Sequence, residues 1–177
     1  MRIIHSHTNG SSETVLARLL LCLLIAFFSV GLQAEENEKS IAPNFTLKSH
    51  QGKNIKLSEL RGQVIMLNFW ASWCGSCIQQ FPQLNQYYQQ NKDRGFTLLA
   101  INMDEDIKKA QRFTGKRNIH FPVLFDPENQ IIQRYSIDDI PAAVLIDRDG
   151  YIRYTLNASQ IKQYKITQQV IKGLLNE

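Results

Sequence analysis

The stretch that decides the fold is VIMLNFWASWCGSCIQQFP, which runs from Val64 to Pro82. Its first seven residues are almost all apolar, which is typical of a central strand covered on both faces of an α/β sheet. A short turn then carries Cys74 and Cys77, and the sequence predicts a helix that departs from the second cysteine. Pro82 has no amide hydrogen and should kink that helix one turn in. Two thiols at this spacing can close a small disulfide ring and open it again.

Size and composition indicate one globular domain. The chain has 177 residues, enough to bury a core without disulfide support. Its formal net charge is +4, and its basic residues are interleaved with acidic ones. We therefore expect a solvated surface and no nucleic-acid groove. A disulfide between Cys74 and Cys77 would close too short a loop to restrain the unfolded chain much. A catalytic role therefore explains the cysteine pair better than stabilisation of the fold does.

Residues 1–34 have the pattern of an export signal. Basic and histidine side chains precede an apolar run from Leu19 to Leu32, and small and polar residues follow it. The run is shorter than the roughly 20 residues that a membrane span needs, but it suits a signal peptide that is cut after Ala34. Because Leu32 is larger than is usual before such a cut, a retained membrane anchor is the alternative. We interpret Cys22, inside the run, as one more apolar side chain.

The rest of the chain predicts a linker over residues 35–41 and an α/β domain over residues 42–177. An N-terminal hairpin is followed by elements in the order β, α, β, α, β, β, α, which predicts a central mixed sheet flanked by helices. The acidic residues 104–106 are interpreted as the start of a helix, where they favour its dipole. The expected strands are 45–47, 55–57, 64–70, 96–102, 123–125, 143–147 and 151–156, and the expected helices are 78–91, 107–117, 126–135 and 161–175.

These features together resemble the thioredoxin superfamily. They look most like the thiol-disulfide oxidoreductases of the TlpA/ResA type, which are related to the AhpC/TSA proteins. The resemblance implies a thioredoxin-like fold, no cofactor, and exchange of a Cys74-Cys77 dithiol with the thiols and disulfides of partner proteins. It covers about residues 41–176 and is carried by Ala42–Leu47, Asn68–Cys77, Phe81-Pro82, Phe121–Val123, Ile140-Pro141 and Leu145–Gly150.

Individual residues then acquire expected roles. Cys74 is the expected nucleophile, because the free amides and the dipole at a helix N-terminus lower the pKa of a thiol. Cys77 is expected to resolve the mixed disulfide. The resemblance implies that Pro141 is cis and packs beside the dithiol, and that Ile140 offers its backbone to an extended partner chain. Trp73, directly before the first cysteine, is expected to form part of an exposed apolar docking face.

Three positions depart from the pattern of these families. Asn68 stands where thioredoxins place a buried Asp, and Gln80 stands where ResA-like proteins place a Glu. Both candidate proton acceptors are therefore neutral, so we expect water or the departing thiolate to take the proton of Cys77. Asp139 stands where a glycine is common. It is either an ordinary solvated loop residue or a charge that raises the pKa of the nucleophilic thiol and selects basic or neutral partners.

The sequence supports one leading function and two alternatives. The leading function is an exported, periplasmic or otherwise extracytoplasmic enzyme that reduces protein disulfides and is recharged by a membrane or periplasmic redox partner. A thiol peroxidase is one alternative, although the Pro-xxx-Thr-xx-Cys arrangement expected there is missing. A copper carrier is the other, because two cysteines can hold Cu(I), whereas a structural zinc needs four ligands.

Overall fold

The structure is a computed structural model that describes residues 40–162 and 164–177. The predicted export segment, Cys22 and residues 35–39 of the predicted linker lie outside the described residues. No helix within the described ranges is long and apolar enough to cross a bilayer. At the start of the described chain, Ile41 forms an antiparallel bridge with Tyr151, and the carbonyl of Ser40 accepts a hydrogen bond from the amide of Ile152.

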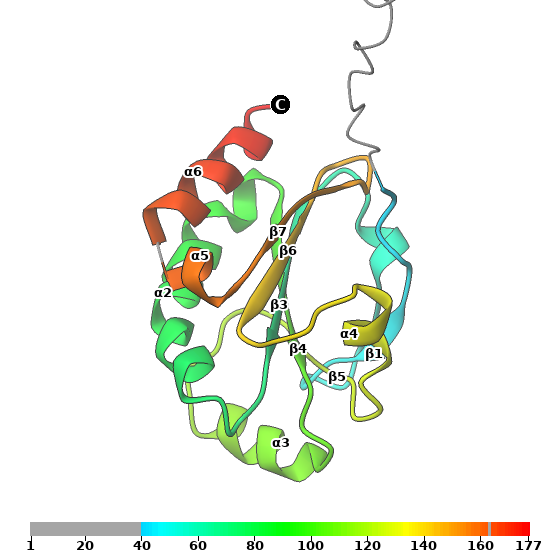
Figure 1. Cartoon of the computed structure of the whole chain (residues 1–177), viewed down its shortest axis with the longest axis vertical. Coiled ribbons are helices and arrows are strands. Elements are labelled where there is room, and N and C mark those ends of the chain that lie inside the picture. The colour runs from blue at the N-terminus through cyan, green and yellow to red at the C-terminus, as the bar shows by residue number, and fades with distance from the viewer. Residues whose placement is uncertain (1–39, 163) are drawn as a thin grey trace, which may run out of the picture. The chain divides into compact units, whose positions relative to one another are not determined.

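A five-stranded mixed sheet with the order β5-β4-β3-β6-β7 forms the centre of the domain (Figure 1). The β3–β4 and β4–β5 pairs are parallel, whereas the β3–β6 and β6–β7 pairs are antiparallel. The predicted mixed sheet is confirmed, and all seven residues of β3 are buried at its centre. The strands are β3 (Val64–Trp70), β4 (Phe96–Asn102), β5 (Val123–Phe125), β6 (Ala142–Ile146) and β7 (Ile152–Leu156).

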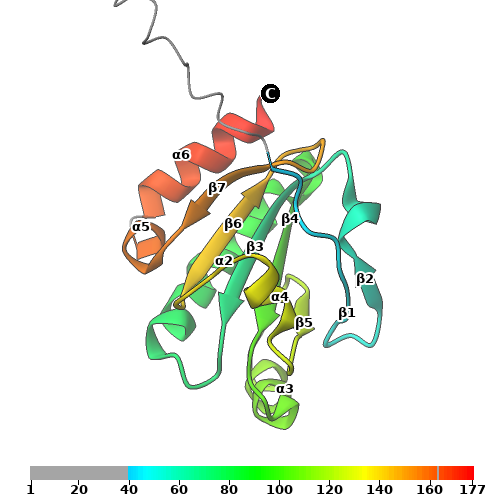
Figure 2. The same cartoon turned by 45° about the vertical axis from the view of Figure 1, so that its right-hand side comes forward.

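Further elements cover both faces of this sheet (Figures 1 and 2). One face packs against α2 (Gly75–Asn91), α3 (Ile107–Gly115), α5 (Ala158–Lys162) and α6 (Tyr164–Leu175). The other face packs against η1 (Leu57–Leu60), α4 (Gln130–Arg134) and the predicted hairpin of β1 (Thr46–Lys48) and β2 (Asn54–Lys56). A short helix, η2 (Lys92–Arg94), connects α2 to β4.

The side chains of β3 alternate between two separate cores, as the pleat of a strand requires. Val64, Met66 and Trp70 belong to the core beneath α2 and α6. Ile65, Leu67 and Phe69 belong to the core on the opposite face. The same alternation places Asn68 on the α2 face of the sheet.

Two helical predictions are corrected by the structure. The helix predicted over 161–175 begins earlier, at Ala158, because the Asn157 side chain accepts hydrogen bonds from the Ser159 and Gln160 amides; residues 158–162 and 164–175 are helical. The helix predicted over 126–135 is confined to Gln130–Arg134. Its first turn is preceded by Asp126, whose carboxylate accepts hydrogen bonds from the amides of residues 130 and 131.

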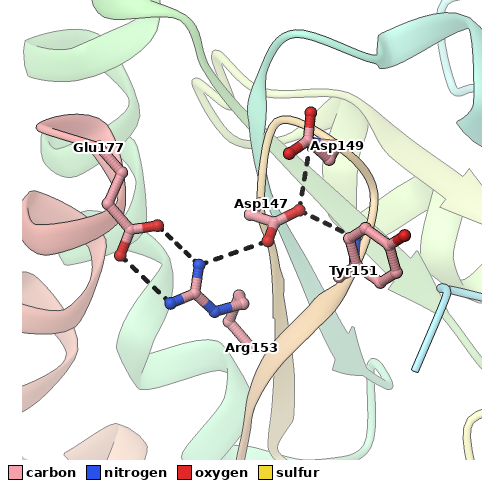
Figure 3. Close-up of polar contacts among 5 residues, drawn as sticks. All are labelled: Asp147, Asp149, Tyr151, Arg153 and Glu177. Atoms are coloured by element: carbon pink, nitrogen blue, oxygen red, sulfur yellow. Dashed lines mark hydrogen bonds and ion pairs between the residues drawn. The ribbon is translucent and has the colours of Figure 1, made fainter. Parts of the chain in front are cut away.

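The carboxylate of Asp147 organises the turn between β6 and β7 (Figure 3). Its Oδ1 accepts from the amides of Asp149 at 3.1 Å and Tyr151 at 2.9 Å, and its Oδ2 accepts from Arg153 at 3.3 Å. Arg153 also pairs with Glu177 at 2.6 Å, which ties the strand to the end of the chain. The turn is therefore held by one nearly buried side chain.

Replacing Asp147 with Ala is expected to lower the free energy of unfolding by about 1–3 kcal/mol, because two backbone donors lose their acceptor. Asp147→Asn retains an acceptor oxygen and should lose less. Arg153→Ala removes the surface ion pairs with Asp147 and Glu177 and should cost at most about 1 kcal/mol. Urea unfolding of the oxidised protein measures all three, and equal losses for the Ala and Asn variants at position 147 would contradict this account.

Candidate active site

Cys74 and Cys77 form a disulfide at the start of α2, with their Cα atoms 5.3 Å apart. Cys74 is the N-cap of the helix: its Sγ accepts from the Cys77 amide at 3.2 Å, and its carbonyl accepts from the Ile78 amide at 3.1 Å. The prediction that the helix departs from the second cysteine is therefore wrong. The helix begins at Gly75, because the capping sulfur and carbonyl of the first cysteine already satisfy donors of the first turn.

The two cysteines differ slightly in exposure. Cys74 keeps 7% of its surface exposed, whereas Cys77 is fully buried. Beside them, Trp73 is 69% exposed and presents a large apolar ring at the surface. Trp70 is instead part of the core and packs edge-on against Phe81 with ring centroids 4.8 Å apart. The exposed indole ring therefore belongs to the residue directly before the first cysteine of the disulfide.

The loop before β6 contains the Ile140-Pro141 pair. The Ile140-Pro141 peptide bond is cis, which confirms the predicted isomer. Pro141 is buried, and Ile140 is half-buried against the core that contains both cysteines. In the sheet, Ala142 pairs with Phe69, so the loop leaves the same end of β3 that leads into the active-site turn.

The sequence analysis missed the role of Asp104. This side chain is 2% exposed, and its carboxylate accepts from the amide and hydroxyl of Ser72 at 2.9 and 2.8 Å and from Asn102 Nδ2 at 2.7 Å. The cap of α3 is instead Asp106, which accepts from the amide of Lys108. The sequence held a signal for this contact. The carboxyl ends of adjacent parallel strands meet at one edge of a sheet, and polar residues follow both β3 and β4.

Asn68 of β3 and Gln80 of α2 are both buried. Asn68 is fully buried and Gln80 is 7% exposed. Gln80 is buried because it follows Cys77 by three positions and so shares the inward face of α2. Neither amide has a hydrogen-bond partner among the described residues.

Asp139 is exposed at the entrance to the cis-proline loop. Its Oδ1 accepts a hydrogen bond from the amide of Ile140 at 2.7 Å, so the carboxylate is held against the backbone of the loop. Elsewhere in the described part of the chain, no group of three or more His, Cys, Asp or Glu side chains is arranged to hold a metal ion.

Residues 39–155 match the family model of the AhpC/TSA family. The chain belongs to the AhpC/TSA family. Among its relatives, a Thiol-disulfide oxidoreductase ResA of Bacillus cereus is 33% identical over 153 residues, which cover 84% of this chain and 88% of the relative. The ResA protein of Bacillus subtilis (strain 168) is 31% identical, over 86% of this chain and 89% of the relative.

Solved structures of related proteins have the same fold. A candidate thiol:disulfide interchange protein DsbE from Chlorobium tepidum superposes with a TM-score of 0.74 and 35% identity, over 77% of this chain and 96% of that one. A candidate protein disulfide isomerase from Bacteroides thetaiotaomicron gives a TM-score of 0.71 and 33% identity, over 78% and 90% of the two chains. The predicted thioredoxin-like fold and TlpA/ResA-like relationship are confirmed. This AhpC/TSA-family protein is a thioredoxin-like thiol-disulfide oxidoreductase.

Removing the carboxylate of Asp104 is expected to loosen the turn before the cysteines. Asp104→Ala should lower the free energy of unfolding by about 1.5–3 kcal/mol, because hydrogen bonds to a buried charged group are lost. It should also raise the hydrogen-exchange rate of the Ser72 amide in the folded protein. Ser72→Ala, which keeps the amide and loses only the hydroxyl, is the matched control and should cost about 1 kcal/mol. Unchanged exchange of that amide in Asp104→Ala would refute the anchoring role.

Proposed function

We propose that this protein is exported and reduces disulfides in partner proteins through its Cys74-Cys77 pair. The observation that carries the proposal is the disulfide at the start of α2, with its first cysteine 7% exposed and its second fully buried. This asymmetry suits a nucleophile that meets the partner and a resolving thiol that the partner cannot reach.

In the reduced protein, Cys74 is the proposed nucleophile. Its sulfur already accepts the amide of Cys77, and the helix dipole adds to the stabilisation of an anion there. No residue of α2 carries a formal charge, and the first charged residue after the helix is Lys92. Backbone amides and the helix dipole therefore supply most of the stabilisation of the thiolate. They are expected to hold the pKa of the Cys74 thiol below that of an ordinary cysteine.

The exchange then proceeds in two displacements. The Cys74 thiolate attacks one sulfur of a partner disulfide, and the other partner sulfur leaves with the electron pair as a thiolate. Cys77 loses its proton and attacks Cys74, which forms the internal disulfide and releases the second partner thiolate. The partner is reduced by two electrons and the dithiol is oxidised by two.

The direction and the location are proposed from the sequence. Trp73-Cys74-Gly75 and the Ile140-Pro141 pair are thioredoxin-like features, and they favour action as a reductant. Residues 1–34 would direct export as a signal peptide or stay as a membrane anchor, residues 35–41 would form the linker, and residues 42–177 the catalytic domain. An exported reductant needs a membrane or periplasmic redox partner to recharge it.

A groove of about 500 Å³ beside the cis-proline loop supports a docking role for this end of the molecule. It is lined by residues 136–139, Ala142 and residues 155–159. The two aspartates are the only charged residues among the described residues that line it. We infer that the Trp73 ring, the Ile140 backbone and Pro141 receive the disulfide-bearing segment of the partner. The groove then favours a basic or neutral flanking segment.

Substitution of the cysteines tests the proposed function. Cys74→Ser should reduce insulin-type disulfides no faster than background, because the attacking sulfur is gone. Cys77→Ser should still attack but should accumulate mixed disulfides with partner proteins, which can be trapped in cells. Cys22→Ser is the matched control and should retain full activity. If Cys74→Ser reduces disulfides at the wild-type rate, the proposal is wrong, and a wild-type protein that binds Cu(I) without reducing disulfides would favour the copper-carrier alternative.

The charge of Asp139 should tune partner choice. Asp139→Asn keeps the oxygen that accepts from the Ile140 amide and removes only the charge. We expect a lower pKa for the Cys74 thiol and a preference for basic over acidic peptide disulfides that falls by about two- to fivefold. Asp93→Asn removes an exposed charge on η2 and serves as the control. An unchanged peptide preference and thiol pKa in Asp139→Asn would leave a solvated loop residue as the correct interpretation.

A further inference from the structure

The surface of α3 and of the loop that follows it is strongly basic. Between Asp106 and Asp126 the chain has no acidic residue, and five basic side chains of this stretch are exposed. None of the five forms an ion pair with another residue in the part of the chain that the structure describes. The displacements described above make no use of this basic face of α3. It consists of Lys108, Lys109, Arg112, Lys116 and Arg117.

A groove of about 270 Å³ adjoins the basic face of α3. Its lining comes from two segments, and Arg117 is the only charged residue among the described residues that line it. Ile78 directly follows the second cysteine of the disulfide, so the groove begins at the first turn of the active-site helix. Its lining consists of Ile78, Phe81, Pro82 and Asn85 of α2 and of residues 117–119. The groove therefore combines apolar walls with one positive charge.

The Asn85 side chain joins the two walls of this groove. Its Nδ2 donates to the carbonyl of Asn118 at 2.6 Å, and its Oδ1 accepts from the amide of His120 at 2.9 Å. Both hydrogen bonds connect α2 to the loop after α3. The groove is thus formed before a ligand arrives, which lowers the entropy that binding must spend on ordering its walls.

The guanidinium of Arg117 is also held in place. Its central carbon lies 4.1 Å from the ring centre of Phe113, and this ring packs against Phe81 of the groove with centroids 5.4 Å apart. Stacking fixes the plane of a guanidinium and leaves its N–H groups available. No described residue accepts a hydrogen bond from them. Such donors suit the carboxylate of a ligand, which a guanidinium can bind through two parallel hydrogen bonds.

The basic face of α3 and the acidic groove at the cis-proline loop lie on opposite sides of β3. The sheet order places β4 on one side of β3 and β6 on the other (Figure 2). Helix α3 follows β4, whereas Asp138 and Asp139 precede β6. Both segments belong to the end of the sheet where β3 leads into α2, because Trp70 pairs with Asn102 and Phe69 pairs with Ala142. This end of the domain is therefore basic on one side and acidic on the other.

We propose that the basic face of α3 and the groove beside it bind an acidic segment of the partner protein, with an apolar side chain against Pro82 and Ile119 and a carboxylate on Arg117. The inference rests on the proposed function, in which Cys74 attacks a disulfide of that partner. Attraction between opposite charges speeds the encounter, and the groove fixes the position of the segment.

A protein segment fits this surface better than an anionic lipid bilayer does. A flat layer of headgroups would meet the exposed cations but would leave the apolar walls of the groove unused. A peptide side chain fills such a groove while a neighbouring carboxylate reaches the guanidinium. Partners whose reactive cysteine has acidic residues on one side and basic residues on the other would match both charged surfaces.

Peptides that carry a coloured aromatic thiol on a single cysteine test the proposal. Attack of the reduced full chain on the peptide sulfur releases the aromatic thiolate, so absorbance reports the rate constant of the first displacement. One peptide places Leu and two Glu residues beside the cysteine, and its matched control has Gln in place of Glu. Each is made with this segment before or after the cysteine. In one orientation, the Glu peptide should react about fivefold faster than the Gln peptide at low salt and lose this advantage at high salt.

Substitutions locate the source of this preference. Arg117→Gln should remove most of the preference for the Glu peptide and leave the rate with the Gln peptide unchanged. Arg117→Lys retains the charge and should restore part of it, because a lysine lacks the planar fork of an arginine. Lys56→Gln removes the same charge from β2, which covers the opposite face of the sheet, and should leave the preference intact.

The outcomes separate this inference from the proposed function. Equal rates for Glu and Gln peptides in both orientations, or an undiminished preference in Arg117→Gln, would overturn the docking site. Equal peptide rates together with binding to phosphatidylglycerol vesicles, lost in Arg117→Gln, would overturn it in favour of a lipid surface. If the wild-type protein releases thiolate from none of the peptides, Cys74 is not the nucleophile and the proposed function itself fails.

Discussion

The pairing of β3 on both of its edges is the constraint on which the site depends. Its parallel partner β4 and its antiparallel partner β6 bring the end of one neighbour and the start of the other to the edge where α2 begins. Asp104 follows β4 and holds Ser72 of the turn before the cysteines, whereas the buried Pro141 directly precedes β6. The reactive sulfurs are therefore positioned by the buried sheet, which is the least deformable part of the domain.

The chemistry around the sulfurs is organised almost without formal charge. The N-terminal amides of α2 are available to stabilise a thiolate on Cys74, and no lysine or carboxylate lies on the helix itself. Asn68 and Gln80 occupy positions where related families carry carboxylates, and both are buried amides, which cannot take up a proton as a carboxylate does. Under the proposed mechanism, the thiol proton of the buried Cys77 therefore has no carboxylate to accept it at either position.

The outer surface of the site combines an apolar anchor with a local reversal of charge. Trp73 is exposed although the other tryptophan is fully buried, and it stands directly beside the sulfur that a partner would reach. The chain as a whole is basic, but the groove next to the cis-proline loop carries Asp138 and Asp139 and no described cation in its lining. Under the proposed function, backbone amides and sulfur carry out the exchange, and these exposed side chains influence which partner binds.

The sequence by itself determined the strands, the sheet that they form and the pair of cysteines at a helix start, because these follow from local periodicity, turn residues and spacing. The family resemblance added the cis bond before Pro141. Only the tertiary structure decided that Gln80 is buried, that Asp104 anchors the turn and that Arg117 lines the same groove as Pro82. Each of these depends on which side chains of distant elements face each other, and that is set by packing between β3, β4, α2 and α3 rather than by any local pattern.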